Sequence, residues 1–222
     1  MSYHPELSLL EAYAKGNVDA CHGIALATHL ELCAHCRQVV KKFEEQQGEQ
    51  LAALEQELST DDWTGMLAEI ITTPVPSAPV SASESLPVTI EVNGKSIAIP
   101  AALRRLIPAD TKWRNFGGKV YSLPLPSEDK VRMSLMYINQ AVSVPQHTHK
   151  GIESTLVLHG GFRDEEGHYE VGDFIQRDAS ICHAPQTDVG QDCLCLAILT
   201  EPMIFTQGVA RVFNLFGKGM YP

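Results

Sequence analysis

The feature that most limits how this chain can fold is a stretch of low complexity, TPVPSAPVSASESLP, at residues 73–87. It contains four prolines and four serines, and its apolar residues follow neither a helical nor a strand period. Proline fixes its φ angle and has no amide hydrogen to donate, so such a stretch favours an extended, exposed linker. We therefore predict two domains, at residues 1–72 and 88–222. With 222 residues, 44% of them hydrophobic, the chain can build a core in each domain.

Before the linker, apolar residues recur at helical intervals, for example at Leu7 and Leu10. Pro5 suits the first turn of a helix, Gly16 suits the position just past its end, and Asp19 can cap the next one. A third helix is expected from about residue 33 to residue 47, and a fourth from residue 59 to about residue 71. Residues 1–72 are therefore expected to form a small helical bundle.

After the linker, the apolar period changes to two. The stretch VTIEVNGKSIAI, at residues 88–99, alternates apolar and polar residues around Asn93-Gly94, which predicts a β-hairpin. Further strand-like runs lie at 119–125, 131–138, 154–158, 169–175 and 193–200. Many short strands without a helical pattern between them predict an antiparallel β-barrel or sandwich. The fold class is thus α + β in two domains.

Acidic side chains are concentrated in the first part of the chain. Of the 27 Asp and Glu residues, twelve precede residue 73, against four of the 17 Lys and Arg residues. An acidic surface repels nucleic acid and suits a basic protein partner, although a solvated helical surface has the same composition. The chain has no apolar run near the ~18 residues of a membrane helix and no secretory signal, so we expect a cytoplasmic location without a membrane partner.

The stretch THLELCAHC, at residues 28–36, places His29, Cys33 and Cys36 at positions i, i+4 and i+7, on one side of a helical segment. Cytoplasmic thiols stay reduced, so a close pair favours a metal or redox site. Two thiolates and an imidazole suit tetrahedral zinc, which in a structural site needs a fourth ligand. We predict His4, because folding can bring it in and thereby tie the first helix to the next two. The other nearby candidates are Cys21, His22 and His35.

Two alternatives for this stretch stay open. The cysteines could be small buried residues beside a structural histidine. They could also be a metal-free redox pair, because the thiols of a CxxC motif have lowered pKa values and oxidise readily.

A second possible site begins in HTHKGIESTLVLHG, at residues 147–160. His147 and His149 face the same side of a strand, and Glu153 follows a glycine turn. With His183 as a distant fourth ligand, three imidazoles and one carboxylate suit Zn, Fe, Mn, Ni or Cu, and we take zinc as the working choice. Two further histidines fall on turn or hairpin positions and are expected to be structural or exposed: His159 and His168.

These motifs carry a family resemblance. The spacing HxHxxxE, followed by Gly160 and then by Gly172 with His183 eleven residues on, is similar to the two metal motifs of the cupin superfamily. With HxxxCxxC in a helical bundle before it, nearly the whole chain resembles ChrR-type anti-sigma factors. The resemblance implies zinc ligands at His4, His29, Cys33 and Cys36, and cupin metal ligands at His147, His149, Glu153 and His183.

The resemblance also implies a function. Such proteins bind an extracytoplasmic-function-type sigma factor and keep it inactive until an oxidative signal, singlet oxygen or an organic peroxide, releases it. The expected partner is thus a sigma factor, with no direct contact to nucleic acid and no catalytic residues. The alternatives are a metal-dependent cupin dioxygenase and a cupin that binds a small molecule in its barrel.

Overall fold

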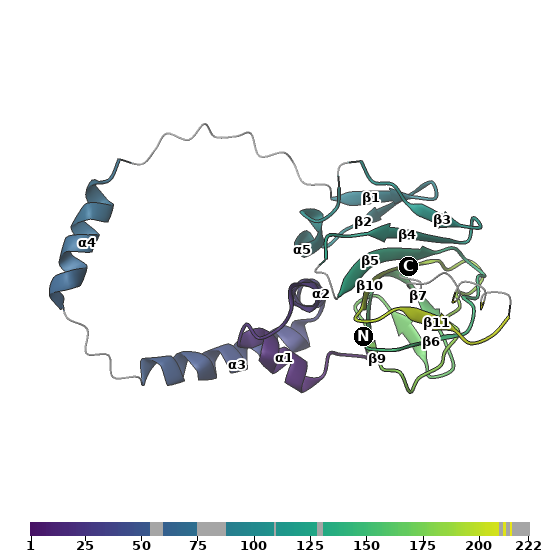
Figure 1. Cartoon of the computed structure of the whole chain (residues 1–222), viewed down its shortest axis with the longest axis horizontal. Helices are drawn as coiled ribbons and strands as arrows, with labels where there is room; N and C mark the ends of the chain where they lie inside the picture. The colour runs from purple at the N-terminus through teal and green to yellow at the C-terminus, as the bar shows by residue number, and fades with distance from the viewer. Residues whose placement is uncertain are drawn as a thin grey trace.

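The computed structural model describes residues 1–53, 60–74, 88–108, 110–127, 131–208, 211 and 214. Four helices precede the first strand (Figure 1). Of the expected linker at 73–87, only residues 73 and 74 are among those described, and the rest lies outside them. Among the described residues, no helix combines the length and apolar character needed to span a membrane.

Three helices pack together: α1 (Leu7–Ala14), α2 (Ala20–Leu32) and α3 (Ala34–Ala52). Their common core contains Leu10, Leu26 and Val40, together with Cys33 and Cys36. The side chain of Asp19 caps α2 by accepting from the backbone amide of residue 22 at 3.0 Å, as the sequence predicts. The predicted bundle of four helices is wrong in one respect. The fourth helix, α4 (Thr60–Thr72), stands apart from the other three (Figure 1).

The rest of the described chain is mainly antiparallel strand. A seven-stranded sheet has the order β3-β4-β5-β10-β7-β8, with β9 also paired to β7, and two pairs, β1-β2 and β6-β11, complete the set. The bounds are β1 (Thr89–Val92), β2 (Lys95–Ala98), β3 (Arg114–Phe116), β4 (Val120–Pro124), β5 (Arg132–Ile138), β6 (His147–His149), β7 (Glu153–Arg163), β8 (His168–Glu170), β9 (Phe174–Arg177), β10 (Cys193–Leu199) and β11 (Met203–Phe205).

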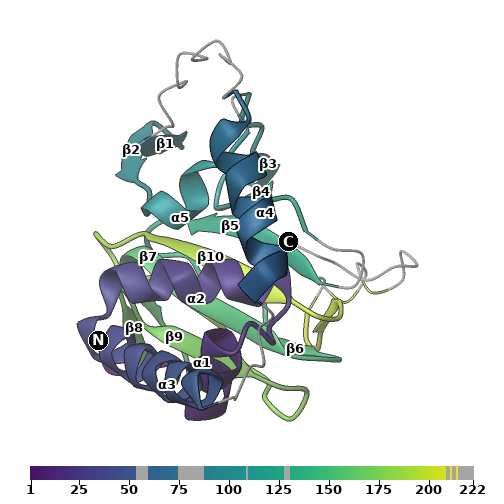
Figure 2. The same cartoon turned by 90° about the vertical axis from the view of Figure 1, so that its left-hand side faces the viewer.

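The central strands are buried on both faces. On one face, Leu194 and Leu196 of β10 pack in a cluster that also contains Cys21 and Ala25 of α2. On the other face, Cys193, Cys195 and Ala197 belong to a second cluster. We call the curved sheet together with the β6-β11 pair the barrel, and this second cluster lines its inside. Figure 2 shows α2 lying across β10 and β7. Helix α2 is therefore packed on the barrel, and the larger of the two clusters continues into it.

Several sequence predictions can be compared with this fold. The hairpin at 88–99 is confirmed, and its turn residues Asn93 and Gly94 both have positive φ, at 49° and 75°. The single strand predicted at 169–175 is wrong, because the chain turns at Gly172, where φ is +92°, and β8 and β9 lie on either side. Three short elements were not predicted: α5 (Ala101–Arg104), β3 and β11.

Candidate metal centres

The first candidate centre brings together His4, His29, Cys33 and Cys36, each of which offers one donor atom. These atoms all lie within 4.8 Å of one another, a spread that a tetrahedral ion with bonds of ~2.0–2.3 Å can bridge. His4 Nδ1 lies 3.5 Å from Cys33 Sγ and 3.4 Å from Cys36 Sγ. The segment before α1 supplies His4, so the cluster joins that segment to the junction of α2 and α3.

A break in the helix at Cys33 shapes this junction. His29 lies in the last turn of α2, Cys33 has extended angles of φ −112° and ψ 102°, and Cys36 lies in the first turn of α3. The Sγ atom of Cys33 accepts from the backbone amide of Cys36 at 3.4 Å and so caps α3. The three residues thus converge across the junction of two helices, in agreement with the third helix that the sequence predicts from about residue 33.

His29 is completely buried, and its two ring nitrogens have different surroundings. Nδ1 lies 2.9 Å from the backbone oxygen of Gly172, which can only accept, so Nδ1 carries the proton and donates. Nε2 is buried without a hydrogen-bond partner, and its lone pair is free for a metal. Burial lowers the pKa of His29 to about 4, so the ring is neutral at pH 7, as a ligand must be.

The other candidates for a fourth ligand have different roles. Cys21 is buried in the core that α2 shares with the barrel. His22 Nδ1 lies 2.5 Å from a carboxylate oxygen of Asp19, and its Nε2 lies 3.3 Å from Ser154 Oγ. His35 is exposed, with its ring centroid 5.3 Å from that of His4. Of the four histidines and cysteines considered, only His4 reaches the cluster.

The second candidate centre contains His147, His149, Glu153 and His183, all buried, with donor atoms within 4.8 Å of one another. His147 and His149 lie two residues apart on β6, so both rings face the same side. Glu153 is the first residue of β7. His183 follows β9, and its backbone pairs with that of His147 through two hydrogen bonds of 3.0 Å. This pairing brings the distant fourth residue to the other three.

The charges of the second cluster suit a cation. Burial opposes ionisation of Glu153, but the imidazoles of His149 and His183 beside it hold the pKa of its carboxyl well below its usual range. Glu153 Oε2 lies 2.9 Å from His149 Nε2 and 3.4 Å from His183 Nε2. Both nitrogens nevertheless lack a partner at hydrogen-bonding angles. Atoms this close that do not point at one another fit a common ion between them.

Comparison with known proteins agrees with this architecture. A family model described as the ChrR Cupin-like domain matches residues 104–201. The whole chain is similar to a protein named Anti-sigma-E factor ChrR from Cereibacter sphaeroides, with 32% identity over 229 residues, 96% of this chain and 97% of the relative.

The chain belongs to the ChrR family. Its structure is also similar to a crystal structure described as Rhodobacter sphaeroides SigE in complex with the anti-sigma ChrR. That match has a TM-score of 0.68 and 30% identity, and it covers 89% of this chain and 98% of the other.

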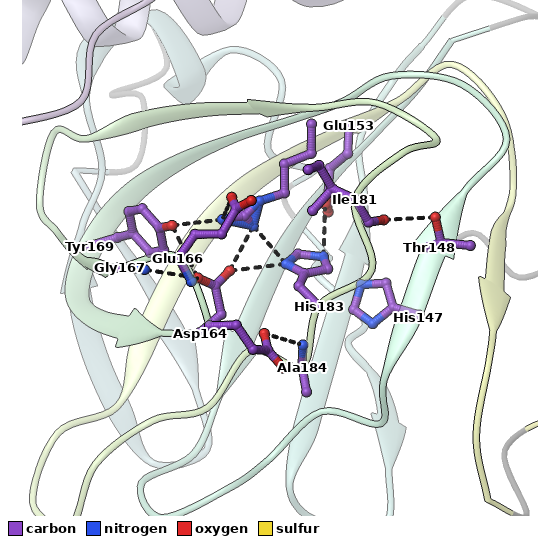
Figure 3. Close-up of polar contacts among 12 residues, drawn as sticks. His147, Thr148, Glu153, Asp164, Glu166, Gly167, Tyr169, Ile181, His183 and Ala184 are labelled. Atoms are coloured by element: carbon purple, nitrogen blue, oxygen red, sulfur yellow. Dashed lines mark hydrogen bonds and ion pairs between the residues drawn. The ribbon is translucent and has the colours of Figure 1, made fainter.

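In this ChrR family member, three residues that sequence reasoning missed hold His183 in place. Asp164 Oδ2 lies 3.1 Å from His183 Nδ1 and accepts from Arg177 at 2.6 Å (Figure 3). Tyr169 accepts from Arg177 at 2.6 Å and donates to Asp164 at 3.1 Å. The Arg177 guanidinium also lies 2.7 Å from His183 Nδ1, but it can only donate. A ring that binds metal through Nε2 carries its proton on Nδ1, so its acceptor is Asp164.

A cavity opens beside the second cluster of this ChrR family member. Its apolar wall is made by Met136, Ile138, Val144, Phe162, Cys195 and Ala197, and His147, Glu153 and His183 border it. An ion held by the cluster would therefore face an apolar space rather than bulk water. The two remaining histidines belong to neither cluster: His159 Nε2 lies 3.3 Å from Asp192 Oδ1, and His168 is exposed on β8.

Proposed function

We propose that this chain is an anti-sigma factor that binds an extracytoplasmic-function-type sigma factor in the cytoplasm and keeps it inactive. The observation that carries the proposal is the match, over 98% of the other chain, to an anti-sigma ChrR solved in complex with SigE. The end-to-end similarity to a protein named as an anti-sigma factor supports it. An anti-sigma factor is a regulator, so we assign this chain no catalytic residues.

The exposed face of α4 supports a protein partner. Trp63, Met66, Leu67, Ile70 and Ile71 lie at helical spacings of three and four residues, and each is at least 50% exposed. Within the residues that the structure describes, no other element covers this stripe. A contiguous apolar face of this kind marks an interaction site. We propose that it is where the sigma factor binds.

We further propose that His4, His29, Cys33 and Cys36 hold a structural zinc ion. The orphaned, buried Nε2 atom of His29 and the two thiols beside His4 form a donor set that suits zinc. The ion would staple the start of the chain to the α2–α3 junction. The ion would then fix the directions of α1, α2 and α3 within the proposed anti-sigma domain, residues 1–72, which residues 73–87 join to the cupin part at residues 88–222.

For the cupin part, we propose that His147, His149, Glu153 and His183 hold a second divalent metal, with zinc as the first choice. We propose that this centre senses the oxidative signal, singlet oxygen or an organic peroxide, and releases the sigma factor. The apolar cavity beside the cluster supports entry of a small molecule. The same cavity favours a second candidate function, a cupin that binds a small ligand without any link to a sigma factor.

Binding by the full-length chain tests the proposal. The chain is mixed with an extracytoplasmic-function-type sigma factor from the same genome, and complex formation and run-off transcription are measured. The variant Leu67→Asp with Ile70→Asp is expected to weaken binding more than about tenfold, because desolvated anchors carry most interface energy. Val189→Asp is the control, because that side chain is 89% exposed and lies in the cupin part. Equal inhibition by all three proteins, or none by the unaltered chain, would contradict the proposal.

A further inference from the structure

Contacts from both clusters lead to one turn of the barrel, the segment between β8 and β9. Gly172 in this turn accepts from His29 of the first cluster at 2.9 Å. The buried carboxylate of Asp173 accepts from the backbone amides of Ser2 at 2.6 Å and Tyr3 at 3.1 Å. The amide of Phe174 donates to the oxygen of Tyr3 at 3.0 Å. The residues on both sides of the turn thus position the segment that carries His4.

The same turn also reaches the second cluster. Tyr169, in the strand before it, contacts Tyr3 in a tilted pair of rings, with centroids 4.8 Å apart and an interplanar angle of 59°. The hydroxyl of Tyr169 binds Arg177 and Asp164, and Asp164 binds His183 (Figure 3). Each of these contacts is direct. A continuous path of side chains therefore runs from His183 to Tyr3, and His4 is the next residue in the chain.

The middle of this path is buried and tightly paired. The side chains of Arg177 and Asp164 are 3% and 0% exposed, and an Arg177 guanidinium nitrogen lies 2.6 Å from Asp164 Oδ2. Tyr169 is 1% exposed and fully packed. When one of these side chains moves, its packed and ion-paired neighbours must move with it, because close-packed interiors have few alternative arrangements.

Separate contacts hold the helices on the barrel. Glu31 of α2 accepts from the backbone amides of Ala101 and Ala102 at 2.8 Å and 2.6 Å, and so caps α5. Cys21 and Ala25 of the same helix are part of the core of the barrel. A shift at Tyr3 can therefore move His4 while α2 stays in place. The zinc cluster would lose one ligand without separation of the two parts.

We propose that Asp164, Arg177, Tyr169 and Tyr3 couple the two clusters, so that a change in the position of His183 loosens the hold of His4 on the first metal. Asp164 and Arg177 are then positioning residues for His183, and Tyr169 and Tyr3 transmit its position. The inference rests on the proposed function for its biological meaning, because it names the route by which the cupin centre would act on the sigma-binding part. The coupling itself is a property of this chain alone.

A double-mutant cycle on the full-length protein loaded with cobalt(II) tests the coupling. Cobalt bound to thiolates has a strong near-ultraviolet charge-transfer band, and only the first cluster contains cysteines. Loss of this band after addition of a chelator therefore reports the first cluster alone. His183→Ala is expected to speed the loss by about tenfold, within the usual range of coupling between two sites.

The position of the path is tested in three backgrounds. With Tyr169→Phe, which keeps the ring but removes its hydroxyl, His183→Ala should change the rate less than about twofold. Tyr3→Ala should have the same effect, because it removes the other ring of the Tyr3–Tyr169 pair. Tyr121→Phe is the matched control, because its hydroxyl donates to Asn93 at 3.0 Å, away from the path. In that background the acceleration should stay at about tenfold.

Other outcomes would overturn the coupling. The proposal fails if His183→Ala does not change the rate, or if it accelerates the loss equally in all backgrounds. Asp164→Asn replaces His183→Ala as the perturbation if the alanine variant does not fold, with the same expectations. No sigma factor is present in these measurements. If the chain binds no sigma factor but Tyr169→Phe still suppresses the effect of His183→Ala, the coupling stands and the proposed function fails. If the chain binds a sigma factor but the effects of the two substitutions simply add, the proposed function stands and the coupling fails.

Discussion

In both clusters the donor atoms lie within 4.8 Å of one another, but the ligands are held in place differently. In each, a histidine that can bind metal through Nε2 donates from Nδ1 to an oxygen. For His183, that oxygen belongs to Asp164 in the same barrel, whereas for His29 it belongs to Gly172, in a different part of the chain. The second cluster is thus complete within residues 147–183. The first depends on the barrel for the orientation of its ligands.

The difference extends to what each cluster joins. The first contains two thiols and links three segments of a small core, so its loss removes much of what holds those helices together. The second lies inside a barrel whose strands are paired and packed on both faces. We infer that the first centre is mainly structural, and that the second can change state while the barrel stays folded.

The largest expected effect is that of Cys36→Ser. Structural zinc contributes ~10–16 kcal/mol in small sites, and the buried Cys36 supplies one of the two thiols of the first cluster. The variant should lose its first metal and much of the helical circular dichroism of residues 7–52. Metal analysis and far-ultraviolet spectra check this, with Cys182→Ser as the control because Cys182 is exposed and outside both clusters. Full helicity without metal would show that the first cluster is not the staple.

A smaller effect is expected from His147→Ala in the second cluster. His147 Nδ1 donates to the oxygen of Pro145, so the ring is held locally and does not belong to the path through Asp164. The variant should lose the second metal, keep its helical signal and still inhibit the sigma factor. An organic hydroperoxide should no longer relieve that inhibition. Transcription assays with and without the peroxide measure this, and His168→Ala, an exposed histidine, is the control.

Two outcomes would change the comparison between the clusters. If His147→Ala abolishes inhibition without any peroxide, the second centre belongs to the inhibitory surface. If peroxide still releases the sigma factor from the His147→Ala variant, the second centre has a structural role like the first.

The smallest expected effect concerns the turn that supports the first cluster. Asp173 accepts from three backbone amides, those of Ser2, Tyr3 and Glu170. Asp173→Ala leaves these donors without their acceptor, which should lower the free energy of unfolding by ~1–3 kcal/mol. The amide of Tyr3 should also exchange its hydrogen faster. Urea unfolding and hydrogen exchange check the two expectations.

Asp188→Ala is the matched control for this measurement. Its carboxylate is 43% exposed and pairs with Arg163 at the surface, so its loss should change stability by no more than ~1 kcal/mol. An equal effect of the two substitutions would mean that the turn does not anchor the start of the chain.

Short-range features of this molecule could be predicted from the sequence. Three of these features depend on residues only a few positions apart, whose relative directions the backbone period sets. They are the Asn93-Gly94 hairpin, the cap at Asp19 and the shared strand face of His147 and His149. The strand predicted at 169–175 failed for a related reason. Apolar residues suited to strands stand on both sides of Gly172, at Tyr169 and Val171 and again at Phe174 and Ile175, and the chain reversal at Gly172 divides them between β8 and β9.

The sequence by itself determined which donors stand close along the chain, three in each cluster, and that a proline-rich stretch lies between a helical and a strand pattern. It did not place the distant fourth donors, His4 and His183, beside the other three. The tertiary structure decided how those donors are aimed. The bond from His29 to Gly172 spans 143 residues, and the path through Asp164, Tyr169 and Tyr3 joins segments from both ends of the chain. Spacing along the chain cannot predict such contacts, because they arise only when the helices pack on the barrel and bury polar atoms that must then find partners.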